Sequence, residues 1–156
     1  MGKDKIEQGQ KQCSKCFPPA ELTCTPSRNM SWSNSSTWCT KNYTGLMVIQ
    51  NREQHDYLKR ELLQTNKYWI GLRKNSSVWM WYGTSRKMES QELWDPNEPN
   101  NIKENEDCVE MSIRRNEPER NGKFNDETCS KTKLALCYTG NIIRQYLYLC
   151  ISYVKE

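Results

Sequence analysis

The sequence predicts an α+β domain that is held together by disulfides. Two helical patterns come first, over residues 31–43 and 51–63, and short apolar runs typical of strands follow them. A long polar loop, residues 83–106, interrupts those strands, and loops of this length are usually functional or disordered. Eight cysteines in 156 residues are the third observation, because cytosolic proteins rarely need so many. The length suits one domain with a proper core.

Composition and charge narrow the class of protein. The net charge is +4, from 23 basic and 19 acidic residues scattered along the chain, which argues against nucleic acid as a partner. Six tryptophans and eight tyrosines, against two phenylalanines, suit both a small core and a polar binding surface. Four N-glycosylation sequons agree with the cysteines in predicting an extracellular location; they lie at Asn29, Asn34, Asn42 and Asn75.

The first helix is expected over residues 31–43, with Trp32 and Cys39 as candidate buried positions. The apolar run at residues 46–50 indicates a strand.

The second helix is expected from Asn51, a favourable N-cap residue, to about Leu63. Leu58 and Leu62 lie four positions apart, so they share the inner face of this helix. His55, the one histidine, has polar neighbours on both sides. We expect it to be exposed and without a catalytic role.

Four further strands are expected at residues 68–72, 78–82, 107–113 and 134–138. Gly71 within the first of these indicates a close approach of another backbone segment. Val109, Met111 and Ile113 are expected on one face of the third. A charged turn is expected at residues 114–121.

The stretch from Trp94 to Cys108 reads WDPNEPNNIKENEDC and has almost no apolar side chain to bury. It is therefore expected to be a surface loop, and it is rich in the oxygen ligands that Ca2+ prefers. If the Glu98–Pro99 bond is cis, the side chains of Glu98 and Asn100 can converge on one ion. A second oxygen cluster follows at residues 125–127. The hypothesis is a Ca2+ site built from both segments, and the alternative is a solvated acidic loop.

The two ends of the chain carry weaker signals. Residues 1–12 have no apolar stretch, so the sequence holds no signal peptide. Cys13 and Cys16 have the spacing of a zinc or redox motif, but no second pair follows, which favours a disulfide-bearing tail. No helical or strand period is visible before about residue 30. Residues 142–154 are apolar but too short to span a bilayer, so no membrane span is predicted.

This order of elements, together with several motifs, resembles the C-type lectin-like domain. The sequence YWIGL at residues 68–72 resembles the WIGL motif of that family, residues 98–100 its EPN motif, and residues 124–126 its WND motif. WIGLRK, NEPNN, EDCVE and ALCYT are most similar to the lectin domain of selectins. The resemblance covers a domain at residues 29–139, between unmatched tails at residues 1–28 and 140–156.

The resemblance implies a C-type lectin-like fold with two helices, two small antiparallel sheets and a long Ca2+-binding loop. It implies two disulfides, Cys39–Cys137 and Cys108–Cys129. The residues expected to hold Ca2+ are Glu98, Asn100, Glu106, Asn125 and Asp126. Those expected to contact carbohydrate are Glu98, Asn100, Asn101, Glu110, Arg115, Asn125 and Glu127. In the family the ion keeps open positions that two neighbouring sugar hydroxyls fill.

The function implied is Ca2+-dependent carbohydrate binding in cell adhesion. The expected partners are fucosylated glycans on cell-surface glycoproteins, including sialylated or sulfated forms. Three residues depart from the family pattern: Phe124 replaces the tryptophan of the WND motif, and Lys67 and Ser112 stand where selectins usually have tyrosines that touch the glycan. Lys67 is expected to meet a sialate or sulfate group by charge.

Two alternative functions compete with this one. The first is a lectin-like domain that binds a protein without calcium or sugar, or a truncated, non-functional selectin-like product. It is favoured by the departures above and by residues 13–30, which show no match to the aromatic strand that precedes the first helix in the family. The second is an enzyme, which the sequence disfavours because one histidine and no nucleophile–base pair cannot form a catalytic triad.

Overall fold

The computed structural model describes residues 15–17, 21–24, 28–62, 65–102 and 104–139. In this part of the chain the elements are β1 (Lys15–Phe17), β2 (Glu21–Cys24), α2 (Trp32–Asn42), β3 (Gly45–Leu46), α3 (Arg52–Glu61), β4 (Asn66–Asn75), β5 (Val78–Trp81), η1 (Gln91–Leu93), β6 (Cys108–Ile113), η2 (Pro118–Arg120), β7 (Lys123–Glu127), β8 (Leu134–Ala135) and β9 (Cys137–Thr139). None of these helices is both long and apolar enough to cross a membrane.

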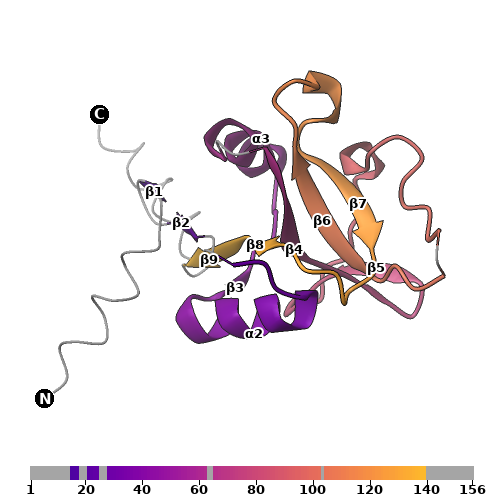
Figure 1. The fold of residues 1–156 in the computed structure, drawn as a ribbon, viewed down its shortest axis with the longest axis horizontal. Coiled ribbons are helices and arrows are strands. Elements are labelled where there is room, and N and C mark those ends of the chain that lie inside the picture. Colours follow the sequence, from indigo (N-terminus) through magenta and orange to yellow (C-terminus); the bar gives the residue numbers. More distant parts are fainter. Residues whose placement is uncertain (1–14, 18–20, 25–27, 63–64, 103, 140–156) are drawn as a thin grey trace, which may run out of the picture.

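The strands form two sheets. The smaller has the order β1-β2-β9-β3, and the larger has the order β5-β4-β6-β7, with β8 added to β4. All neighbours are antiparallel except β4 and β8. Figure 1 shows α2 and α3 on either side of the small sheet, with β5 to β7 and the long loop toward the other end of the molecule. The predicted α+β class with two helices and two sheets is confirmed.

The helix α2 confirms the expected first helix. Ser31 has an extended backbone and its side chain accepts a hydrogen bond from the backbone of Asn34, so it caps the N-terminus. Trp32 and Cys39 are 2% and 0% exposed, as predicted. The indole of Trp32 donates to the carbonyl of Ile70 at 2.9 Å, which joins this helix to the large sheet.

The helix α3 begins after Asn51, whose side chain accepts from the backbone of Gln54 at 2.9 Å. Leu58 is buried, as expected for the inner face. The predicted exposure of His55 is wrong, because its side chain is buried and its Nε2 lies 2.8 Å from the carbonyl oxygen of Gly122. The reason is tertiary, since the β6–β7 connection packs over this turn of the helix. Burial lowers the pKa of His55, and the hydrogen bond to Gly122 opposes that effect.

Four strand predictions need correction. The single strand expected at residues 134–138 is divided into β8 and β9, which belong to different sheets. Residues 46–50 are a strand only at their start, and the buried residues after Leu46 link the two sheets without joining either ladder. The strand β7 was missed because four of its five residues are polar. The strands β1 and β2 lie before residue 30, where no period was visible, and β2 pairs with β9 in the place expected of the missing first strand. The predictions for Cys13 and residues 142–154 lie outside the described residues.

The core continues through the middle of β4. Trp69, Ile70 and Leu72 are fully buried, and Gly71 sits among them. A Cβ on Gly71 would lie 2.9 Å from the carbonyl oxygen of Leu46, so this position has no room for a side chain. The predicted close backbone approach is therefore confirmed, and it is the contact between the two sheets.

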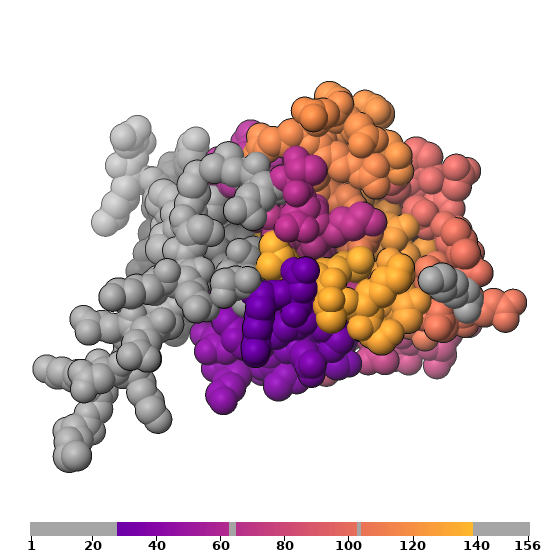
Figure 2. All heavy atoms as spheres, viewed as in Figure 1, coloured from indigo at the N-terminus to yellow at the C-terminus, as the bar shows by residue number. Residues whose placement is uncertain are grey.

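Two disulfides hold the two halves of the chain together. Cys39 and Cys137 join α2 to β9, and Cys108 and Cys129 join β6 to the segment that follows β7, as the resemblance implied. Figure 2 shows the start of the domain, in indigo, beside its end, in yellow. Backbone hydrogen bonds between Met30 and Lys133 hold these two segments together.

Candidate metal centre

The long loop is anchored at both ends. At its start, Trp94 is buried against Phe124 of β7 and Trp79 of β5, with ring centroids 6.2 and 5.2 Å away. At its end, Cys108 enters β6 and forms its disulfide with Cys129. Between these anchors the left-handed residues Asn97, Asn101 and Glu104 turn the chain. The loop is consequently fixed against the end of β7, where the second oxygen cluster lies.

Asp126 of β7 is the centre of the candidate site. Its side chain is 1% exposed, and its two oxygens accept from the backbone of Asn100 at 3.0 Å and of Asn101 at 2.9 Å. The loop also bonds to itself, because Glu106 accepts from the backbone of Ile102 and donates its own backbone N–H to the side chain of Asn101. These bonds bring the two oxygen clusters of the sequence together. The Glu98–Pro99 peptide bond is cis.

Glu98 lies in an environment that disfavours its negative charge. One of its oxygens accepts from the amide of Asn100 at 2.8 Å, and the other, Oε2, is buried with no hydrogen-bond partner in the described part of the chain. Burial, then the neighbouring Asp126 and Glu106, raises the pKa of Glu98 to about 7. A cation placed among these carboxylates would stabilise the charged form of Glu98.

The donor set fits a hard cation such as Ca2+. Across the described ranges, no group of three or more His, Cys, Asp or Glu side chains is arranged to hold a metal. A site here must therefore combine carboxylates with amide oxygens, which is the mixture that Ca2+ accepts. Asn100 and Asn125 supply the amides beside Glu98, Glu106 and Asp126.

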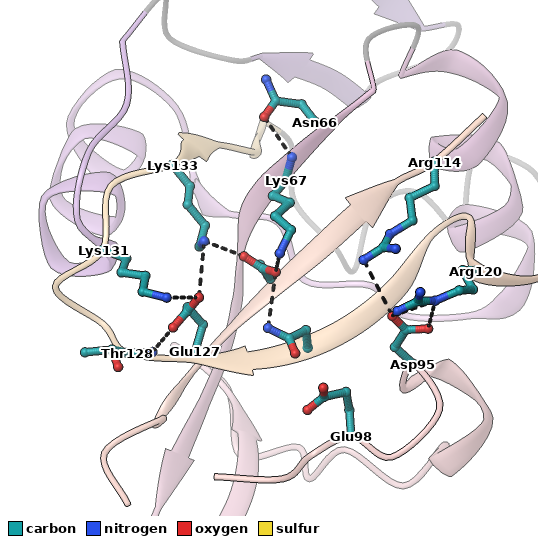
Figure 3. A network of polar contacts seen from close by, with 12 residues as sticks. Asn66, Lys67, Asp95, Glu98, Arg114, Arg120, Glu127, Thr128, Lys131 and Lys133 are labelled. Atoms are coloured by element: carbon teal, nitrogen blue, oxygen red, sulfur yellow. Dashed lines mark hydrogen bonds and ion pairs between the residues drawn. The ribbon is translucent and has the colours of Figure 1, made fainter. Parts of the chain in front are cut away.

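A cluster of ion pairs borders the candidate centre along β6 and β7, and Figure 3 shows its members converging. Glu110 of β6 is fully buried. Its Oε1 lies 2.7 Å from the ammonium of Lys67, and its Oε2 lies 2.6 Å from that of Lys133. The amide nitrogen of Asn125 also donates to Glu110, at 3.2 Å, which turns the amide oxygen of Asn125 away from this glutamate. We call Lys67, Glu110, Glu127, Lys131 and Lys133 the lysine cluster.

Glu127 is the second carboxylate of the lysine cluster. Lys131 bonds to it at 2.8 Å and Lys133 lies 3.6 Å away, while its own following residue, Thr128, donates a backbone hydrogen bond. Burial alone would raise the pKa of Glu127, but the bonds from Lys131 and Thr128 and the charge of Lys133 outweigh it and lower the pKa. The pKa values of Glu98 in the loop and Glu127 at the end of β7 are thus shifted in opposite directions.

Some predicted site residues lie elsewhere. Arg115 donates from Nη2 to the carbonyl oxygens of Arg60 and Leu62, both at 2.9 Å, at the C-terminal end of α3. Its predicted contact with carbohydrate stays a prediction. All four sequon asparagines, Asn29, Asn34, Asn42 and Asn75, are exposed, and the amide of Asn42 donates to the carbonyl of Trp38 at 2.8 Å.

One groove of the surface lies away from the candidate centre. It has a volume of about 750 Å³ and lies between α3, residues 85–93 and η2, and none of the predicted ion or carbohydrate residues lines it.

Sequence reasoning missed several residues around the centre. Lys131 and Lys133 were not identified, and neither was Asp95, whose carboxylate is bound by Arg120. A signal for the two lysines existed in their spacing of two residues, which would place both on one face of an extended segment. Nothing local connects Asp95 with Arg120, because they are 25 residues apart.

Comparison with known proteins agrees with this fold and these motifs. The family model described as the lectin C-type domain matches residues 28–139. E-selectin from Oryctolagus cuniculus is 50% identical over 114 residues, which are 72% of this chain and 20% of the relative. L-selectin from Bos taurus is 45% identical over 116 residues, 73% of this chain and 31% of the relative. The chain therefore spans about a fifth to a third of the length of these relatives.

Solved structures give the same fold at low sequence identity. The carbohydrate-recognition domain of the mouse scavenger receptor C-type lectin has a TM-score of 0.66 at 19% identity, covering 81% of this chain and 99% of that one. The Kupffer cell C-type lectin receptor Clec4f has a TM-score of 0.69 at 20% identity, covering 88% of this chain and 89% of that one. The chain belongs to the C-type lectin domain family, and the curated relatives that establish its place beside the selectins are 44–50% identical to it.

Proposed function

We propose that the chain is a Ca2+-dependent carbohydrate-binding module of the selectin kind. The observation that carries the proposal is that backbone bonds from Asn100 and Asn101 to Asp126 join the two oxygen-rich segments, and that the neighbouring Glu98 has a buried oxygen without a partner in the described residues. Carboxylates held this close by backbone bonds favour a bound cation. Asn100 and Asn125 complete a set of oxygen ligands of the type that Ca2+ takes.

The residues of the site would share two tasks. When bound, Ca2+ supplies a charge that attracts the neutral hydroxyl oxygens of a sugar. Glu98, Glu106 and Asp126 balance that charge, and the amides of Asn100 and Asn125 offer both an acceptor oxygen and a donor nitrogen to the same hydroxyls. The backbone bonds from the loop to Asp126 hold these groups in place before the ligand arrives, which lowers the entropy lost on binding.

The glycans that suit this surface are fucosylated and carry an acidic group. The lysine cluster holds three ammonium groups against two carboxylates, and Lys67 and Lys131 are about half exposed, at 47% and 48%. A sialate or sulfate group beside the ion would meet this excess of positive charge. Asn101, Glu127 and Arg115 are further proposed contacts.

We place this activity outside the cell, in adhesion to glycoproteins. The two disulfides and the exposed sequons suit an oxidising compartment. The selectins that the chain resembles are longer than this chain, so the assignment of their kind of partner to it is part of the proposal. The chain acts by binding and not by catalysis, since its matches are to lectin domains.

A lectin-like domain that binds without calcium is the second candidate. Glu110, a predicted carbohydrate contact, is fully buried and both of its oxygens lie against lysine ammonium groups, so its side chain is not exposed to a sugar. One solved neighbour of the fold, at 19% identity and a TM-score of 0.62, is a calcium-independent type II antifreeze protein.

A binding experiment separates the two candidates. Immobilised neutral fucosylated, sialylated fucosylated and sulfated fucosylated oligosaccharides would be exposed to the protein in millimolar Ca2+ and in EGTA. We expect binding in Ca2+ only, and a loss of at least about tenfold in Asp126→Asn. Asp56→Asn, which removes a partly exposed carboxylate on α3, is the matched control and should bind like the wild type. Binding that EGTA leaves unchanged would contradict the proposal and favour the second candidate.

A further inference from the structure

A second set of ion pairs lies on the other side of the candidate centre, at the start of the long loop (Figure 3). Asp95 is 6% exposed. Arg120 grips it with two nitrogens: Nε lies 2.9 Å from Oδ1, and Nη2 lies 2.5 Å from Oδ2. Arg114 adds a longer contact of 3.8 Å, and Glu117 bonds to both arginines. We call Asp95, Arg114, Glu117 and Arg120 the arginine cluster.

The backbone of Asp95 connects the two halves of the candidate centre. Its N–H donates to the carbonyl oxygen of Phe124 at 2.8 Å, and Phe124 immediately precedes Asn125 in β7. Its carbonyl oxygen accepts from the N–H of Glu98 at 2.9 Å. Asp95 is therefore bonded to a neighbour of one proposed ion ligand and directly to another.

Arg120 is itself held in place by the fold. It ends η2, and its N–H donates to the carbonyl of Glu117 at 3.0 Å. Two residues later, the N–H of Gly122 donates to Ser112 of β6 at 2.7 Å, and the carbonyl of Gly122 meets His55 of α3. The side chain of Arg120, which binds Asp95, thus belongs to a segment that is hydrogen-bonded to both β6 and α3.

The arginine cluster has two carboxylates and two guanidinium groups, so it carries no excess charge with which to attract or repel an ion. The planar two-nitrogen contact fixes the orientation of a carboxylate as well as its distance. Any effect of this cluster on the ion must therefore act through geometry.

We propose that Asp95 and Arg120 are positioning residues for the candidate Ca2+ site. The pair holds the loop so that Glu98 and Asn125 keep the separation that an ion requires, although neither Asp95 nor Arg120 is a proposed ligand. This inference rests on the proposed function, and it assigns to the loop start a role that the ligand residues alone do not explain. Residues that orient metal ligands usually matter for affinity.

The test compares Ca2+ affinity with stability in three variants of the full chain: Arg120→Met, Arg120→Lys and Asp95→Asn. Isothermal titration with Ca2+ alone, well below the melting midpoint, gives the dissociation constant, and melts in EGTA give the stability of the ion-free fold. We expect Arg120→Met to weaken Ca2+ binding roughly tenfold and Arg120→Lys to recover part of that loss. Hydrogen exchange in EGTA should be faster at the amide of Glu98 in Arg120→Met.

Glu92→Gln is the matched control, because it breaks the exposed ion pair between Glu92 and Arg52 and should leave the dissociation constant within about twofold. If Arg120→Met melts earlier in EGTA but binds Ca2+ like the wild type, the pair is merely structural and the inference is overturned. If the wild type itself binds no Ca2+, the proposed function fails, and the inference fails with it.

Discussion

Two ion-pair clusters flank the candidate centre, and they differ in charge, burial and chemistry (Figure 3). The arginine cluster balances two guanidinium groups with two carboxylates and lies at the start of the loop. The lysine cluster sets three ammonium groups against two carboxylates and lies along β6 and β7. One side of the centre is therefore neutral, and the other keeps a positive charge.

The side chains suit these different tasks. A guanidinium forms a rigid planar fork, which fixes geometry, whereas an ammonium on a flexible stem can move to a new partner. In the lysine cluster Lys133 is 10% exposed and pairs with buried Glu110, whereas Lys67 and Lys131 are about half exposed. In the proposed function, the arginine cluster sets how tightly Ca2+ is held, and the lysine cluster sets which glycans are accepted.

The largest effect is expected from breaking the buried part of the lysine cluster. Glu110→Gln keeps the shape of the side chain but leaves the ammonium of Lys133 with only the more distant Glu127. Loss of one partner from a buried pair should lower the free energy of unfolding by about 3 kcal/mol. Urea unfolding monitored by tryptophan fluorescence measures this. A change below about 1 kcal/mol, typical of surface pairs, would show that the cluster is solvated.

A pH titration distinguishes Glu98 in the loop from Glu127 at the end of β7. Glu98 has its pKa raised to about 7 from an ordinary value of 4.5, so without an ion the protonated carboxyl is favoured by the fold. The stability that this group contributes in EGTA is full below pH 4.5 and is lost as the pH rises through about 7. Ca2+ must displace that proton, so Ca2+ affinity should fall by up to about tenfold per unit below pH 7.

Ca2+ titrations between pH 8 and pH 5.5 check this expectation. Glu127 has a lowered pKa and stays charged in the range, so the lysine cluster should be unaffected. Asp56→Asn, the control of the binding experiment, should give the same pH profile as the wild type. A Ca2+ affinity that is flat over the range would contradict the role given to Glu98.

The smallest effect is expected at the exposed edge of the lysine cluster. Lys67→Met removes an ammonium that is 47% exposed, and Glu110 keeps Lys133 as a partner. Stability should change by no more than about 1 kcal/mol. Binding to a sulfated fucosylated glycan should fall several-fold while binding to its neutral counterpart changes little, as surface plasmon resonance would show. An equal loss for both glycans would mean that Lys67 does not select for acidic ligands.

The sequence predicted what depends on local pattern and family motif. Helices were predicted over residues 31–43 and, from the cap residue Asn51 and the spacing of Leu58 and Leu62, over residues 51–63, and α2 and α3 lie there. The family resemblance predicted both disulfides, and both are present in the structure. The candidate ligands were predicted in two segments, and the bonds from Asn100 and Asn101 to Asp126 bring these segments together.

The remaining features depend on contacts between distant parts of the chain. His55 is buried by the turn at Gly122, and polar neighbours in the sequence gave no sign of it. The strand β7 has four polar residues out of five, so no apolar alternation marked it. The pairing of Asp95 with Arg120 arises only after the loop and η2 have folded against each other.

The central claim is that the loop and β7 together form a Ca2+ site. Thermal melts of the wild-type protein at pH 7.5, in millimolar Ca2+ and in EGTA, test it most directly. An ion that binds only the folded state adds about 2.7 kcal/mol at a hundred times its dissociation constant, so the midpoint should rise clearly in Ca2+. Asp126→Ala should abolish the rise. Two cooperative melts with the same midpoint in Ca2+ and EGTA would contradict the claim.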